Sequence, residues 1–184
     1  MLRNDADAWG APAKLLHWAM AALILAQVAL GVMAVAWRLS PTKLNLYFWH
    51  KSTGMLLLAL LVLRLGWRLA NRAPALPGGL PAWERSAAHA GHALLYLLMA
   101  ALPVTGWIVN AAANIPLRIF GLIPLPAIVA PDKALADLAA WVHRGLFVLL
   151  ALVLVAHIGA ALRHHYVKRN SVLVRMLPGK WSRP

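Results

Sequence analysis

Four long apolar stretches alternate along the chain with short segments rich in proline, glycine and charge. They cover about residues 15–37, 47–69, 87–110 and 138–162. A helix needs roughly 20 apolar residues to cross the hydrocarbon core of a bilayer. Backbone groups in hydrocarbon must also hydrogen-bond within their own segment, which favours helix. The pattern therefore predicts an all-α fold: a transmembrane four-helix bundle that forms one integral-membrane domain over residues 1–184.

The connections between these spans carry clear helix-ending signals. Ser40 and Pro41 mark a turn after the first span, and residues 72–83 contain three prolines and two glycines. Residues 111–131 are apolar but contain four prolines, so we expect them to form a lid on the membrane surface. The first apolar run is too long for the core of a cleavable signal peptide and lacks a following small-residue cleavage site. We therefore expect it to be retained as the first helix.

The composition agrees with a membrane protein and narrows the chemistry. Hydrophobic residues make up 62% of the chain and charged residues 12%, whereas soluble domains have about 25% charged residues. There is no cysteine, which excludes disulfides, thiolate metal sites and a covalently attached c-type haem. The eight histidines are then the main candidates for binding a transition metal, with the six methionines as weaker ligands.

The net charge of +13 arises from basic residues that flank the apolar runs. We interpret them as topology signals and contacts to anionic lipid. Nucleic-acid binding is not expected, because no soluble basic domain is left to carry it. Twelve basic residues lie on the side of both termini: Arg3, Lys14, Arg64, Arg68, Arg72, Arg85, Arg163, Lys168, Arg169, Arg175, Lys180 and Arg183. Six lie on the other side: Arg38, Lys43, Lys51, Arg118, Lys133 and Arg144. This asymmetry predicts that both termini are cytoplasmic.

Histidine is the most informative residue type in the apolar runs. Ionisable residues inside membrane helices are rare and usually functional. One such histidine would more often be a hydrogen-bonded core residue than a ligand. Six of them, distributed over all four spans, favour a functional interpretation: His17, His50, His89, His92, His143 and His157.

Depth in the membrane sorts four of these histidines into two pairs. His143 and His157 are 14 residues apart on the last span, which is about 21 Å along a helix with both side chains on nearly the same face. If the chain crosses the membrane four times, His50 lies at the depth of His143 near the outer surface. His17 then lies at the depth of His157 near the inner surface.

Two histidines from two helices, facing each other across a bundle, suit the axial ligation of a haem iron. A zinc ion usually takes three or four protein ligands, and each depth supplies two. Bis-histidine ligation leaves no open position on the iron, which favours electron transfer over oxygen activation. The spacing thus favours two non-covalent haems; the alternative is a bundle with scattered polar residues that binds no cofactor. Six glycines would let helices and macrocycles approach closely: Gly31, Gly54, Gly91, Gly106, Gly145 and Gly159.

Other polar residues near the cytoplasmic end have more than one interpretation. His89 and His92 are spaced i, i+3 on one helical face. They could contact a quinone or relay protons, lie at the level of the lipid headgroups, or replace His17 or His157 as a ligand. His164 and His165 are expected at the membrane interface.

Arg64 and Arg68 occupy the last turns of the second span. They could extend their guanidinium groups to the headgroups. They could instead pair with haem propionates, because guanidinium matches the geometry of a carboxylate.

Four segments in order carry a family resemblance. They are KLLHWAMA, FWHKSTGMLLLALLVLRLGWRL, HAGHALLYLLMAALPVTGW and WVHRGLFVLLALVLVAHIGAALRHHYVKRNSVLVRMLPGK. On these segments the chain resembles the bacterial four-helix cytochrome b561 family over nearly its whole length. The resemblance implies two haem b groups with His17, His50, His143 and His157 as axial ligands. It also implies a location in the bacterial inner membrane with cytoplasmic termini.

The resemblance implies an oxidoreductase but leaves its substrates open. Some members are thought to oxidise superoxide on the outer face and to reduce ubiquinone, and others are described only as electron carriers. Superoxide is an anion that positive residues near an outer haem would attract, and the candidates are Lys51, Arg144, Arg118 and Lys133. Ordinary contact with headgroups explains these charges equally well. The alternative function is a haem b anchor subunit that relays electrons between a periplasmic redox protein and quinone.

Overall fold

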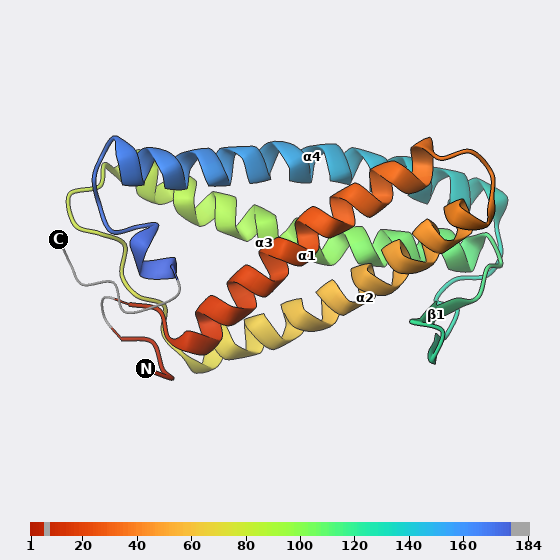
Figure 1. The fold of residues 1–184 in the computed structure, drawn as a ribbon, viewed down its shortest axis with the longest axis horizontal. Helices are drawn as coiled ribbons and strands as arrows, with labels where there is room; N and C mark the ends of the chain where they lie inside the picture. The colour runs from red at the N-terminus through yellow and green to blue at the C-terminus, as the bar shows by residue number, and fades with distance from the viewer. Residues whose placement is uncertain (6–7, 178–184) are drawn as a thin grey trace.

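The computed structural model describes residues 1–5 and 8–177. Lys180 and Arg183, two of the basic residues counted towards the topology, lie outside the described residues. Four long helices run the length of the molecule (Figure 1): α1 (Ala11–Ala36), α2 (Pro41–Ala70), α3 (Ala82–Ala112) and α4 (Lys133–Tyr166). All four are long and apolar enough to cross a membrane. This arrangement confirms the predicted all-α four-helix transmembrane bundle.

Helices α2 and α4 begin before the predicted apolar spans, because polar residues cap their first turns. Ser40 precedes α2, and its hydroxyl accepts a hydrogen bond from the Lys43 N–H at 3.4 Å. Asp132 precedes α4, and its carboxylate accepts from the Leu135 N–H at 3.0 Å. Such caps satisfy N–H groups that have no partner within the helix.

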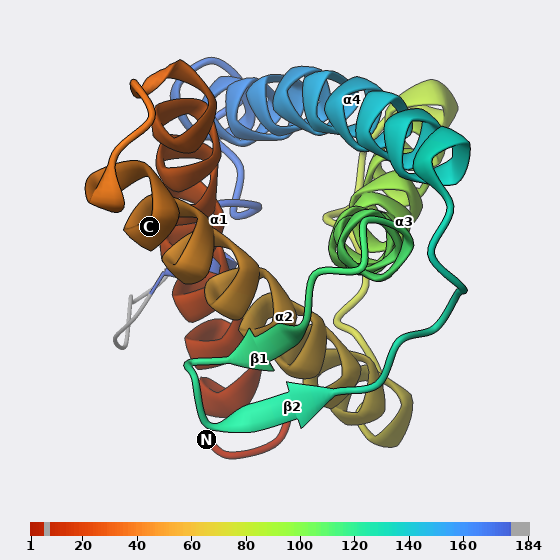
Figure 2. The same cartoon turned by 90° about the vertical axis from the view of Figure 1, so that its right-hand side faces the viewer.

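The bundle consists of two helical hairpins. Helix α1 packs against α2, and α3 packs against α4, while the two hairpins meet mainly through α2 and α3. Figure 2 shows α1 and α2 on one side of the molecule and α3 and α4 on the other. A buried apolar cluster joins the four helices at mid-length: Met20, Ile24, Leu57, Leu61, Leu95, Leu98 and Leu150.

The connection between α3 and α4 contains a β-hairpin that the sequence analysis did not predict. Strand β1 (Leu117–Ile119) pairs antiparallel with β2 (Ile123–Leu125), and Leu117 faces Leu125. Gly121 at the turn has a positive φ of 73°, which glycine adopts without strain. Three-residue strands are too short to give a recognisable alternating pattern.

This β-hairpin lies across the end of α2 (Figure 2). The Phe120 N–H donates to the hydroxyl of the fully buried Ser52 at 2.9 Å. The Phe120 ring also lies 6.0 Å from the ring of Trp49. Trp49 and Ser52 flank His50 in the sequence. The hairpin is therefore held by the helical turn of α2 that carries His50.

At the opposite end of the bundle, the segment after α4 folds back towards the start of α1. It contains the short helix η1 (Val174–Met176), which lies near the start of α1 in Figure 1. The Lys14 ammonium donates to the Leu177 carbonyl at 2.9 Å, and the Trp18 indole N–H donates to the Met176 carbonyl at 2.7 Å. Residues 167–177 are thus tied to the helix that carries His17.

Candidate haem sites at two histidine pairs

The first histidine pair lies at the end of the bundle that carries the β-hairpin. His50 is on α2 and His143 is near the start of α4, so the pair spans the two helical hairpins. Their imidazole ring centroids are 6.2 Å apart, and the rings are inclined by 77°. We call these two residues the outer pair.

The second pair lies towards the opposite end. His17 is on α1 and His157 is on α4, and their ring centroids are 6.3 Å apart with an inclination of 65°. Leu150, a member of the buried apolar cluster, lies on α4 midway in sequence between His143 and His157. We call His17 and His157 the inner pair. The structure thus brings together the same partners that the depth argument paired.

Both pairs have the separation that an iron ion between two imidazoles requires. A metal–imidazole nitrogen bond is about 2.0 Å long, so two imidazoles on opposite sides of one ion have centroids about 6 Å apart. Within the described residues, no group of three or more His, Cys, Asp or Glu side chains could hold a metal ion. The imidazole Nδ1 of His50 is buried without a hydrogen-bond partner there. Paired imidazoles without further protein ligands fit haem iron, whose remaining ligands come from the macrocycle.

Glycines let neighbouring helices approach the outer pair. A Cβ added to Gly31 on α1 would lie 2.9 Å from His50 Cε1, and one added to Gly106 on α3 would lie 3.4 Å from His143 Cε1. A Cβ added to Gly54 on α2 would lie 3.0 Å from the carboxamide nitrogen of Gln27. An added Cβ at Gly91, Gly145 or Gly159 would meet no heavy atom within 4 Å. Three of the six expected glycines therefore sit at close side-chain approaches.

Two polar residues that sequence reasoning missed lie beside the outer pair. Gln27 on α1 donates to the His50 carbonyl at 2.8 Å and accepts from the Thr53 hydroxyl at 2.5 Å. Thr105 on α3 has its hydroxyl oxygen 3.0 Å from His143 Nδ1. A glutamine within an apolar run was a readable signal, because its carboxamide needs a partner in a membrane. Thr105 gave no comparable signal, since threonine is common in membrane helices.

A third imidazole lies at the inner pair. The His92 ring centroid on α3 is 5.6 Å from that of His157. Within the described residues, His89 makes no such ring contact with the pair. His89 and His92, which were predicted to share a helical face, therefore differ in their distance from the inner pair. His92 is the one that contacts it.

Arg64 also faces the inner pair. Its Nε donates to the Tyr96 hydroxyl at 3.1 Å, and one of its terminal nitrogens lies 3.4 Å from His17 Nδ1. The Arg68 guanidinium lies 5.7 Å from the centroid of the Tyr96 ring. Arg64 thus lies beside His17, and Tyr96 contacts both guanidinium groups.

The four basic residues considered for anion attraction have different surroundings. Lys133 is exposed and forms a 2.6 Å ion pair with Asp137, one turn along α4. The Arg144 guanidinium lies 4.3 Å from the centroid of the Trp141 ring. Lys51 is half-buried and Arg118 is exposed on β1. Within the described residues, Lys51, Arg118 and Arg144 have no acidic partner, so Lys133 contributes least to a net positive field.

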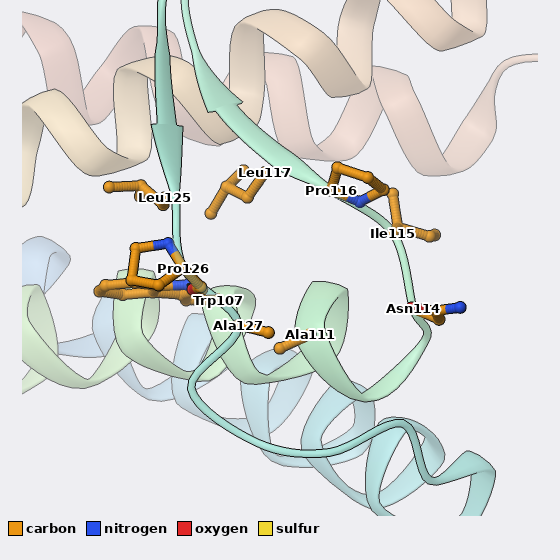
Figure 3. A pocket seen from close by; sticks show the side chains of 9 residues that line it. All are labelled: Trp107, Ala111, Asn114, Ile115, Pro116, Leu117, Leu125, Pro126 and Ala127. Carbon is orange, nitrogen blue, oxygen red and sulfur yellow. The ribbon is translucent and has the colours of Figure 1, made fainter.

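A cavity of about 220 Å³ lies between the end of α3 and the β-hairpin (Figure 3). The Trp107 indole N–H donates to the Pro126 carbonyl at 2.9 Å on its rim. The residues that line the cavity are mainly apolar: Trp107, Ala111, Asn114, Ile115, Pro116, Leu117, Leu125, Pro126 and Ala127. None of the four paired histidines lines this cavity.

Comparison with known proteins connects this geometry to a family. Residues 8–179 match the family described as prokaryotic cytochrome b561. The chain belongs to the prokaryotic cytochrome b561 family. Membership means that it binds b-type haem and transfers electrons in a bacterial membrane.

Individual relatives agree with this assignment. The chain is 34% identical to cytochrome b561 homolog 2 of Escherichia coli (strain K12), over 97% of this chain and 95% of the relative. It is 30% identical to cytochrome b561 homolog 1 of the same organism, over 76% of this chain and 78% of the relative. It is 33% identical to a protein of Yersinia pestis named "Probable superoxide oxidase CybB", over 71% of this chain and 74% of that relative.

Proposed function

We propose that this cytochrome b561 binds two haem b groups, one at the outer pair and one at the inner pair, and passes electrons between an outer-face donor and ubiquinone. The observation that carries the proposal is the geometry of the two pairs, whose ring centroids are 6.2 and 6.3 Å apart. His50 and His143 would then hold the iron of the outer haem. His17 and His157 would hold that of the inner haem. We treat residues 1–184 as one functional domain.

The haems supply one-electron chemistry when bound, and the protein's residues hold and insulate them. Two imidazoles holding each iron would leave no position for oxygen to bind. The buried leucine and methionine side chains between the pairs exclude water from the middle of the bundle. Arg64 and Arg68 would pair with propionates of the inner haem, because guanidinium matches the geometry of a carboxylate and Arg64 lies beside His17.

We assign the quinone or proton site to the inner end, with His92 as its closest histidine. His92 lies beside His157, so a quinone bound there would be near the inner haem. An imidazole can donate and accept protons near neutral pH, which quinone reduction requires. His89 is the neighbouring candidate on the same helix.

Superoxide is the proposed electron donor. The name of the Yersinia pestis relative supports this choice, as do three cations without acidic partners in the described chain: Lys51, Arg118 and Arg144. A positive field raises the encounter rate of a small anion. A donor protein docking at the outer face is the alternative, which would make the chain a haem anchor subunit.

Stopped-flow spectroscopy of the purified protein distinguishes these donors. We expect a pulse of superoxide to reduce the haems, and ubiquinone to reoxidise them. Superoxide dismutase added before the pulse should abolish the reduction. Haems that quinol reduces but superoxide does not would contradict the superoxide assignment and favour the anchor-subunit function.

We also propose that the protein lies in the inner membrane with both termini in the cytoplasm. The basic residues favour this orientation. The outer pair and the β-hairpin then face the periplasm, where an external donor has access.

A further inference from the structure

Thr105 lies in the membrane-spanning part of α3, directly before the glycine that faces His143. Its hydroxyl oxygen has two polar neighbours. The Leu102 carbonyl oxygen is 2.9 Å away and His143 Nδ1 is 3.0 Å away. Both distances are those of normal hydrogen bonds.

For a neutral imidazole, one arrangement of protons satisfies both contacts, and the Leu102 carbonyl is a further hydrogen-bond acceptor for the His143 ring. A threonine hydroxyl has a single proton to donate, and a carbonyl oxygen can only accept. The Thr105 proton therefore goes to the Leu102 carbonyl. The second contact then requires His143 Nδ1 to carry a proton and to donate it to the Thr105 oxygen. In this tautomer the lone pair of His143 is on Nε2, which is the state required of a metal ligand.

Among the described residues, the other three paired histidines have no side-chain acceptor at Nδ1. His50 Nδ1 is buried without a hydrogen-bond partner in the described chain. His17 Nδ1 faces a guanidinium nitrogen of Arg64 at 3.4 Å, and guanidinium has no acceptor. No hydrogen bond to the His157 ring occurs among the described residues. His143 is thus the paired histidine whose Nδ1 meets a side-chain acceptor.

We propose that Thr105 is a positioning residue that fixes the tautomer of His143 and lowers the midpoint potential of the outer haem. The proposal rests on the proposed function in placing a haem between His50 and His143. An acceptor for the second ring nitrogen makes a histidine ligand more basic. A more basic axial ligand stabilises the oxidised iron, and hydrogen bonding around the ligands is one of the factors that set haem potentials. With both haems bound, a lower outer potential would favour transfer of the electron towards the inner haem.

A spectroelectrochemical titration of the holoprotein tests this role. The outer component is first assigned as the one that His50→Ala removes. Thr105→Val keeps the size of the side chain but removes the hydroxyl, so we expect the outer midpoint potential to rise while the inner one stays unchanged. Thr105→Ser keeps the hydroxyl and should restore the wild-type value. Thr42→Val, the same exchange at an exposed threonine, is the control.

The possible outcomes separate this inference from the proposed function. A Thr105→Val protein with two haems and an unchanged outer potential would overturn the role of Thr105 alone. If Thr105→Val loses the outer haem and Thr105→Ser keeps it, the hydroxyl positions the ligand as proposed. Loss in both variants would assign the effect to packing of the methyl group and overturn the inference. Wild-type protein with fewer than two haems would instead overturn the proposed function.

Discussion

The imidazole of His50 faces that of His143 across the bundle, with 6.2 Å between the ring centroids. The two residues are 93 positions apart in sequence. They belong to different helical hairpins, so their approach depends on how the hairpins dock. Anything that changes the distance between α2 and α4 should therefore act on the outer haem first.

Gly31→Ala should reduce binding of the outer haem selectively. An added Cβ would lie 2.9 Å from His50 Cε1, and such overpacking typically costs about 1–3 kcal/mol. The imidazole would have to leave its position opposite His143. Absorption spectra of the purified variant should show loss of the outer component with the inner one retained.

Gly66→Ala is the matched control for this substitution. It places the same methyl group on a membrane helix where nothing lies within 4 Å, and alanine is the better helix former. Its haem content should equal that of the wild type. If Gly31→Ala has the same haem content as the wild type, the close packing of α1 on His50 is not needed for binding of the outer haem.

The rate of outer haem reduction by superoxide should fall as ionic strength rises, because salt screens exposed charges. Lys51→Gln combined with Arg144→Gln should lower the rate at low salt by a few-fold and flatten its salt dependence, on the order expected for electrostatic steering. Lys133→Gln should have a smaller effect, because Asp137 already pairs with Lys133. A rate indifferent to salt and to these charges would contradict steering.

The carboxylate of Glu84 should hold the segment that follows α4. It is buried at the start of α3 and accepts from Arg163 at 3.1 Å and from Lys168 at 2.5 Å. Glu84→Gln would weaken both contacts, because a neutral amide attracts cations less strongly than a carboxylate. Trypsin should then cleave after Lys168 and Arg169 faster than in the wild type, as followed by mass spectrometry.

Asp137→Asn is the control for Glu84. It removes the acid of an exposed ion pair between neighbouring turns, and such pairs contribute little to stability. Cleavage near residue 168 should not change in this variant. If Glu84→Gln also leaves the cleavage rate unchanged, the ion cluster does not hold the C-terminal segment in place.

Reporter fusions test the orientation. The excess of basic residues on the side of both termini predicts a cytoplasmic C-terminus. A C-terminal green fluorescent protein fusion should fluoresce, and an alkaline phosphatase fusion at the same site should be inactive. The opposite pattern would place the outer pair in the cytoplasmic half of the membrane.

The sequence was sufficient to predict the helices and the pairing of the four histidines. Both follow from regular geometry: apolar length sets the spans, and the 14-residue spacing of His143 and His157 sets two depths. The β-hairpin was not predictable, because its strands are short and its position depends on the buried Ser52 hydroxyl. The distinction between His89 and His92 likewise depends on the rotation of α3, which packing determines.

The side chains that contact the paired histidines could not be predicted from the sequence either. Thr105 becomes informative only when α3 docks on α4 and brings its hydroxyl to His143. The i, i+4 spacing of Lys133 and Asp137 already indicates an ion pair. In the sequence analysis, Lys133 is nevertheless grouped with the other cations that could attract superoxide. Local patterns thus predicted which histidines lie at each depth, and tertiary packing determined what each one contacts.

The haem content of the wild type and of single histidine variants tests the central claim most directly. A pyridine haemochrome assay normalised to protein should give two haem b per wild-type chain and about half of that in His50→Ala. His17→Ala should also lose about half, but its spectrum should lack the other component, because the two pairs are about 21 Å apart along the bundle. One haem per wild-type chain, or loss of the same component in His50→Ala and His17→Ala, would contradict the two pairs.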